Sequence, residues 1–110
     1  MIINYNSENF NELTKEKVLV DFYANWCGPC KMIAPELEKI SNDIKIIKVD
    51  IDKHNDLARE FAVMSIPCLI LFENNKEIKR NIGFMPEAKL KEFIKYAYKV
   101  YFILFIYAII

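Results

Sequence analysis

The sequence has few of the residues that would support a disulfide framework, a metal cluster or a nucleic-acid-binding surface. Its 110 residues include only three cysteines, one histidine and two glycines. Fifteen acidic side chains balance fifteen basic ones, so the chain has no net charge with which to attract nucleic acid. Three cysteines, two of them in one short motif, cannot build a network of structural disulfides. In a reducing compartment such a pair is more often catalytic or metal-binding than structural.

No internal repeat or low-complexity linker appears in the sequence, and we expect no secretory signal. The first eight residues lack the basic segment and the long apolar run of a secretory signal, which predicts a cytoplasmic protein. The chain length lies near the commonest domain size, and 54% of the residues are hydrophobic. We therefore expect one globular domain with a substantial core.

The sequence does contain short apolar runs typical of strands, which alternate with segments whose apolar residues recur at the spacing of a helix. The predicted elements, in chain order, are a strand at 18–24, a helix at 27–42, a strand at 44–50, a helix at 55–62, a hairpin of strands at 68–72 and 77–82, and a helix that opens at Pro86. Asn74 and Asn75 tolerate the left-handed backbone of a tight hairpin turn. This order predicts an α/β fold, a sheet with helices on both faces.

A pair of cysteines lies where the first predicted strand leads into the first helix. Cys27 and Cys30 are three residues apart, separated by Gly28 and Pro29. Thiol–disulfide exchange needs one thiolate to attack and a second thiol to resolve the mixed disulfide. Unpaired N–H groups at a helix start favour the thiolate of Cys27. We expect the sulfur of Cys27 to be exposed and that of Cys30 to be buried, and in this context the motif favours redox catalysis.

Metal binding and hydrolysis are the alternatives for these thiols. Cys27, Cys30, Cys68 and His54 could nominally supply four zinc ligands, but the sequence has no second C-x-x-C motif and no paired histidine, so we predict no metal site. A cysteine hydrolase would need a histidine base near Cys27. His54 is the one candidate, and we expect it to be solvated just before the second helix.

Several short motifs recur together in the order and spacing of one known family. The segments are Val20–Ala24, Trp26–Lys31, Ala34–Pro35, Lys48–Asp50, Ser65–Pro67 and Gly83. Over residues 1–98 the sequence resembles the thioredoxin family, and its only two glycines, Gly28 and Gly83, fall on matching positions. The resemblance implies a thioredoxin fold over residues 1–99, a mixed central sheet flanked by helices on both faces. It also implies a thiol–disulfide oxidoreductase that reduces protein disulfides.

The resemblance assigns roles to four catalytic residues. Cys27 is expected to be the attacking thiolate and Cys30 the resolving thiol, and the two form the redox-active disulfide. Asp21 resembles the buried acid that helps to move the proton of the resolving cysteine, with Lys48 as its partner. A lone aspartate in an apolar strand is otherwise costly to bury. The alternative is that Asp21 lies at a strand edge.

The resemblance also implies a flat apolar surface that accepts client proteins, and a cis bond between Ile66 and Pro67 beside the dithiol. The expected substrate-binding residues are Trp26, Gly28, Pro29, Ile66, Pro67, Gly83 and Phe84. For Trp26 and Phe84 the alternative is ordinary core packing. Pro35 resembles the proline that kinks the active-site helix.

Three features depart from the family pattern. Tyr23 replaces a tryptophan that is frequent in the family, and its aromatic ring predicts little change. Cys68 follows the proline where threonine is more usual, and we expect it to be a buried structural thiol, with a third redox-active thiol as the alternative. The third departure is the uncharged apolar run of residues 100–110, which we expect to extend the last helix. It is too short to span a bilayer as a helix, so we predict self-association or peripheral membrane contact, with intramolecular packing as the alternative.

Partners and competing functions follow from the same motif. We expect no bound cofactor, with reducing equivalents supplied by a thioredoxin reductase and passed to disulfide-containing clients. A disulfide isomerase or oxidase is an alternative, but isomerases tend to carry a histidine before the second cysteine, where this chain has Pro29. A non-enzymatic subunit is the other alternative, which the intact dithiol, Asp21 and Pro67 argue against.

Overall fold

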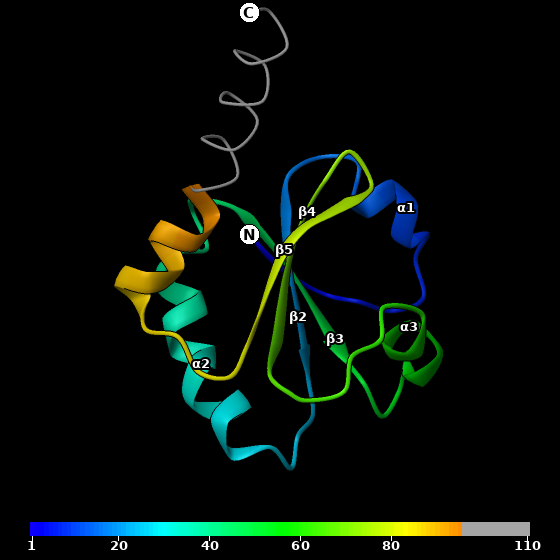
Figure 1. The fold of residues 1–110 in the computed structure, drawn as a ribbon, viewed down its shortest axis with the longest axis horizontal. Coiled ribbons are helices and arrows are strands. Elements are labelled where there is room, and N and C mark those ends of the chain that lie inside the picture. Colours follow the sequence, from blue (N-terminus) through cyan, green and yellow to red (C-terminus); the bar gives the residue numbers. More distant parts are fainter. Residues whose placement is uncertain (96–110) are drawn as a thin grey trace, which may run out of the picture.

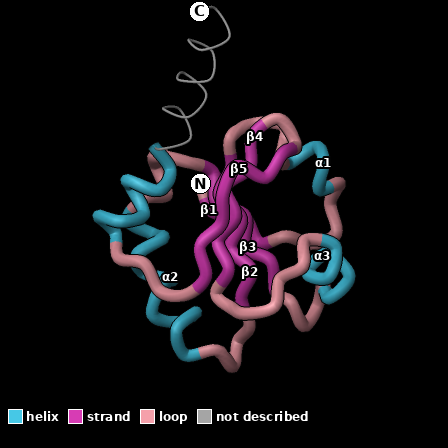
Figure 2. The backbone as a smooth tube through the Cα atoms, viewed as in Figure 1, coloured by secondary structure: helices cyan, strands magenta, loops and turns pink. Residues whose placement is uncertain are grey.

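The computed structural model describes residues 1–95, in which five strands form one mixed sheet. The strands are β1 (Ile2–Asn4), β2 (Val18–Tyr23), β3 (Lys45–Asp50), β4 (Cys68–Glu73) and β5 (Lys76–Ile82). They lie side by side in the order β1-β3-β2-β4-β5. β1 and β2 run parallel to β3, whereas β4 runs antiparallel to β2 and β5 antiparallel to β4. Figure 2 shows the strands as a central layer with helices on either side, as the sequence predicts.

Helices cover both faces of this sheet. The helices are α1 (Phe10–Leu13), α2 (Gly28–Lys39), α3 (Asn55–Glu60) and residues 87–95. In Figure 1, α2 and the last helix lie on one side of the sheet, and α1 and α3 lie on the other. Within residues 1–95, no helix is both long and apolar enough to cross a membrane. The predicted helical extension at 100–110 and the predicted domain end at residue 99 lie outside the described residues.

The alternation of side chains along β2 explains how one strand serves both cores. Val20 and Phe22 pack with α1 and α3, whereas Leu19 packs with α2 and the last helix. Because successive side chains of a strand point to opposite faces, Asp21 shares the face of Leu19. The sheet therefore places this acidic residue under the helix that begins at the cysteine pair.

The two elements missing from the sequence-based assignment are the short ones near the N-terminus. β1 has only three residues, too few to show an alternating pattern, and it is held by parallel pairing with β3. α1 has only four residues, but its start has a recognisable signal. The side chain of Asn9 accepts a hydrogen bond from the N–H of Glu12, and an Asn–x–x–Glu pattern is typical of a helix N-cap.

The remaining boundaries differ from expectation by a few residues. α2 ends at Lys39, earlier than predicted, because the chain turns at residues 40–43, where Asn42 and Asp43 favour non-helical conformations. The hairpin turn is confirmed, since Asn74 and Asn75 have φ values of 53° and 63°. The last helix begins directly after Pro86, whose carbonyl accepts from the N–H of Leu90.

Candidate active site

The cysteine pair closes a disulfide at the start of α2. Cys27 is the N-cap residue, and its Sγ accepts a hydrogen bond from the backbone N–H of Cys30 at 3.2 Å. The two Cα atoms are 5.2 Å apart, within the range that a disulfide spans without backbone distortion. Pro29 lies in the first turn, where helices tolerate proline because its missing N–H would have had no intrahelical partner. The expected bond between Cys27 and Cys30 is present.

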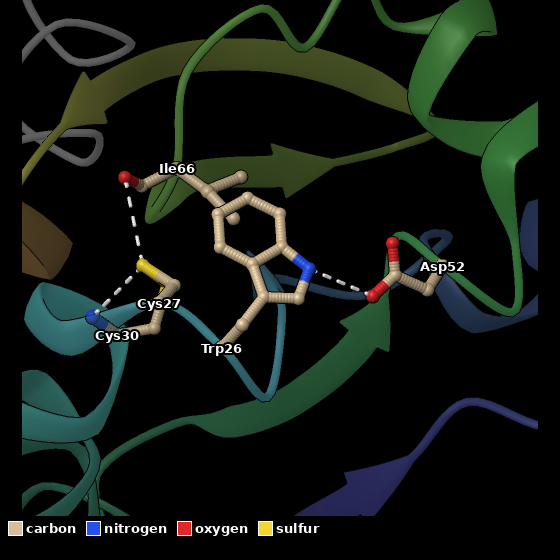
Figure 3. The surroundings of a disulfide bond; sticks show 5 residues. All are labelled: Trp26, Cys27, Cys30, Asp52 and Ile66. Atoms are coloured by element: carbon tan, nitrogen blue, oxygen red, sulfur yellow. Dashed lines mark hydrogen bonds between the residues drawn. A yellow bond between two sulfur atoms is a disulfide. The ribbon is translucent and has the colours of Figure 1, made fainter.

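The two cysteines are equally buried from solvent but differ in the residues around them. Cys27 is 5% exposed and Cys30 is 4% exposed, so the expectation of an exposed Cys27 is wrong for the disulfide form. Ile66 and Ala24 pack against the pair, and Sγ of Cys27 lies 3.8 Å from the carbonyl oxygen of Ile66 (Figure 3). Neighbours of Cys27 in the chain, Gly28 and Pro29 among them, are nevertheless exposed.

Asp21 is buried on the sheet face that α2 covers. Asp21 is 1% exposed, and neither of its carboxyl oxygens has a hydrogen-bond partner among the described residues. Burial raises the pKa of Asp21 from 3.8 to about 6, against the attraction of Lys48, which lowers it. Asp21 lies in the middle of β2, which removes the alternative of a strand-edge position.

Lys48 lies opposite Asp21 on the neighbouring strand β3. Its Nζ is 4.6 Å from the centre of the Tyr23 ring, close enough for a cation–π contact. Lys48, Tyr23 and Cys30 line one small pocket of about 120 Å³. The structure therefore brings the second cysteine and the lysine to the same opening beside the buried acid.

A second segment meets the dithiol from the other side. The Ile66–Pro67 peptide bond is cis, as the resemblance implies. The N–H of Gly83 donates to the carbonyl of Pro67 at 2.8 Å, which places the two residues side by side. Gly83 has a φ of 99°, a conformation that favours glycine, whereas a Cβ at Gly28 would meet nothing within 4 Å. Only Gly83 needs to be glycine for backbone reasons.

Large apolar side chains are exposed in the segments that flank the dithiol. Trp26 is 69% exposed and Phe84 is 45% exposed, so neither is an ordinary core residue. Met64 is 88% exposed, and the sequence-based site did not include it, although it stands two residues before Ile66. Exposed apolar side chains that gather into one patch are typical of a protein-binding surface.

The comparison with known proteins identifies the family. A sequence model of the family described as Thioredoxin matches residues 1–96. The chain belongs to the thioredoxin family. The thioredoxin of Mycoplasmoides gallisepticum is 46% identical over 85 residues, covering 74% of this chain and 85% of that protein. The thioredoxin of Staphylococcus saprophyticus is 42% identical over 99 residues, covering 86% of this chain and 95% of that protein.

Solved thioredoxin structures show the same arrangement. The thioredoxin of Malassezia sympodialis superposes with a TM-score of 0.78 at 34% identity, covering 87% of this chain and 92% of that chain.

A bifunctional thioredoxin reductase/thioredoxin of Mycobacterium leprae is 47% identical over 81 residues, which are 70% of this chain and 18% of that protein. Membership of the thioredoxin family, together with the Cys27–Cys30 pair, makes the chain a thiol–disulfide oxidoreductase that reduces protein disulfides.

Two other predicted candidates lie away from the dithiol of this thioredoxin-family protein. Cys68 is a free thiol, 1% exposed, on the face covered by α1 and α3, and burial raises the pKa of its thiol. His54 is half-buried: its Nε2 lies 3.2 Å from the carbonyl oxygen of Tyr5, and its ring packs on the Tyr5 ring. His54 therefore lies directly before α3, as expected, but its side chain is only partly solvated. In residues 1–95 no three metal-ligating side chains are grouped to hold an ion.

Proposed function

We propose that Cys27 opens client disulfides and that Cys30 releases the reduced client, with Asp21 and Lys48 managing the proton. The observation that supports this most directly is the Cys27–Cys30 disulfide at the start of α2, with the Cys30 N–H donating to the Cys27 sulfur. In the dithiol state that N–H and the helix dipole would stabilise a thiolate at Cys27. The thiolate attacks one client sulfur, forms a mixed disulfide and releases the other client sulfur as a thiolate.

The second step belongs to Cys30. Its thiolate attacks Sγ of Cys27, which restores the Cys27–Cys30 disulfide and releases the second client thiolate. The proton that Cys30 gives up needs an acceptor in a water-poor site. Asp21 suits this role because its pKa of about 6 lets it hold a proton or release one near neutral pH, and it lies under α2. Lys48 lines the pocket that reaches Cys30 and attracts the Asp21 carboxylate.

Client proteins would meet the dithiol through the apolar residues around it. The proposed surface consists of Trp26, Gly28, Pro29, Ile66, Pro67, Gly83 and Phe84. Gly28 and Pro29, which follow Cys27 in the chain, are exposed, and a Cβ at Gly28 would meet nothing within 4 Å. The Ile66 carbonyl, already beside that sulfur, is available to a client backbone N–H. Aromatic side chains supply much of the binding energy in such surfaces.

Reducing equivalents would come from a thioredoxin reductase, with no cofactor bound to this chain. The M. leprae relative supports this partner, because it is a bifunctional thioredoxin reductase/thioredoxin. Regeneration of the dithiol takes two electrons and two protons per cycle, which such a reductase supplies.

A cytoplasmic location fits this partnership and stays a prediction. For residues 100–110 we keep self-association or peripheral membrane contact as the proposal.

The test is an insulin reduction assay with NADPH and a bacterial thioredoxin reductase as the recycling system. The protein is expected to reduce insulin disulfides catalytically with the reductase and only stoichiometrically without it. A parallel assay with scrambled ribonuclease measures disulfide isomerisation. Faster reactivation of ribonuclease than reduction of insulin would contradict the proposed reductase role and favour the isomerase alternative.

A further inference from the structure

The orientation of the exposed Trp26 indole is fixed at its single polar atom. Nε1 donates a hydrogen bond to Oδ2 of Asp52 at 3.0 Å. Figure 3 shows Nε1 turned toward Asp52, while the sulfur of Cys27 lies toward Ile66. An indole N–H is a donor only, and a carboxylate acceptor makes the bond stronger than a neutral acceptor would. Most of the ring is exposed, so packing restrains it little, and this hydrogen bond restrains the orientation of the ring.

Asp52 is itself held in place by Asp50. Asp52 lies in the turn between β3 and α3, and its backbone N–H donates to Oδ1 of Asp50 at 2.9 Å. The other oxygen of Asp50 accepts from Nδ2 of Asn25 at 3.5 Å, and Asn25 directly precedes Trp26. Asp50 is the last residue of β3 and is 6% exposed. Its two oxygens therefore join the turn that carries Asp52 to the loop that carries Trp26.

We infer that Asp52 is a positioning residue for client binding. Its carboxylate holds the Trp26 indole in the orientation that a protein client meets beside the dithiol, and Asp50 orders the turn from which Asp52 acts. This inference rests on the proposed function, in which Trp26 contacts the client. A side chain that is free to rotate must be ordered at each encounter, and that cost falls on complex formation. Sulfur exchange at Cys27 does not involve the indole and is left unchanged.

The test compares two disulfide substrates in single-turnover reactions of the reduced protein. Insulin presents a protein surface, whereas hydroxyethyl disulfide presents almost none. In Asp52→Ala the half-saturating insulin concentration is expected to rise about three- to tenfold, the cost of ordering one side chain at an interface, with the limiting rate retained. The rate with hydroxyethyl disulfide stays at the wild-type value. Asp52→Asn keeps an oxygen acceptor and recovers most of the loss, and Asp43→Ala, which removes an exposed carboxylate in another turn, has no effect.

Fluorescence and a double variant separate positioning from direct contact. Trp26 is the only tryptophan, so its steady-state anisotropy reports this side chain alone. The anisotropy is expected to fall in Asp52→Ala and to stay unchanged in Asp43→Ala. Trp26→Phe keeps an aromatic ring without the N–H, so adding Asp52→Ala to it should raise the half-saturating insulin concentration no further.

Three outcomes would overturn the inference. One is an Asp52→Ala variant with wild-type anisotropy and wild-type insulin kinetics. Another is an equal loss with insulin and with hydroxyethyl disulfide, which would place Asp52 in the sulfur chemistry. The third is a full effect of Asp52→Ala in the Trp26→Phe background, which would mean that Asp52 contacts the client itself. If the wild-type protein fails to reduce insulin, the proposed function is wrong, independently of Asp52.

Discussion

Replacing Asp21 by asparagine is expected to stabilise the folded protein at neutral and higher pH. The wild-type carboxyl group is buried without a hydrogen-bond partner. Burial disfavours its charged form and raises its pKa to about 6, compared with 3.8 for an unburied carboxyl group. The amide of asparagine is similar in size and never carries the charge.

The sign and the size of the effect follow from the two pKa values. Below pH 3.8 the carboxyl group is protonated in both the folded and the unfolded protein, so the variant and the wild type should differ little. As pH rises from 3.8 to about 6, the unfolded chain loses its proton while the folded protein keeps it, and the wild type loses stability. Above that window the loss is complete. A gap of about two pKa units corresponds to about 3 kcal/mol, at about 1.4 kcal/mol per unit.

Urea denaturation of the oxidised proteins at several pH values measures this difference. The free energy of unfolding of Asp21→Asn minus that of the wild type should be near zero at about pH 3.5 and should reach about 3 kcal/mol by about pH 8. Other titrating groups are common to both proteins and cancel in the difference. A difference that stays constant with pH, or a variant less stable than the wild type at pH 8, would refute the buried-acid argument.

The remaining predictions concern the chemistry and the C-terminal run. Cys27→Ser should abolish turnover, and Cys30→Ser should accumulate mixed disulfides with clients on a non-reducing gel; stable adducts of Cys27→Ser would reverse the two roles. Asp21→Asn should keep its fold but reduce insulin more slowly near neutral pH, by up to about 10²-fold, because the proton acceptor for Cys30 is lost; an unchanged rate would remove Asp21 from the mechanism. Lys48→Met removes the attraction that lowers the pKa of Asp21. In the Lys48→Met background, the change in unfolding free energy caused by Asp21→Asn should therefore develop at higher pH than in the wild-type background. An unchanged midpoint pH would exclude an interaction between the two residues. Deleting residues 100–110 should leave insulin reduction near the wild-type rate while changing oligomer size or partition into vesicles, measured by light scattering and flotation; loss of activity in a folded, truncated protein would contradict this.

The chemistry-bearing residues could be predicted from sequence because they lie in short, local patterns. The cysteine pair follows an apolar strand and begins a helix, and these features are visible within about ten residues of one another. The side of the sheet on which Asp21 lies also follows from strand alternation once the α2 face is known. The short elements β1 and α1 carry too few residues for a periodic signal, and pairing and capping hold them instead.

Contacts between distant segments could not be predicted in this way. Trp26 and Asp52 are separated by 26 positions in the sequence. They meet because β2 and β3 are parallel neighbours, so the segments that follow the two strands emerge at the same edge of the sheet. The cover over Cys27 has the same origin, since Ile66 approaches from the segment before β4. Such contacts depend on the order of the strands in the sheet, which the residue patterns of a single sequence do not predict.

The location of Cys68 bears on the electron stoichiometry of the protein. Cys68 pairs with Phe22 across β2 and β4, in the core beneath α1 and α3, whereas Cys30 belongs to the helix on the opposite face. The sheet itself thus separates the third sulfur from the dithiol. The native protein can therefore carry two electrons per cycle without internal disulfide shuffling. A crosslink between Cys68 and Cys30 would need the sheet to come apart, so it would report a chain that had unfolded before it was oxidised.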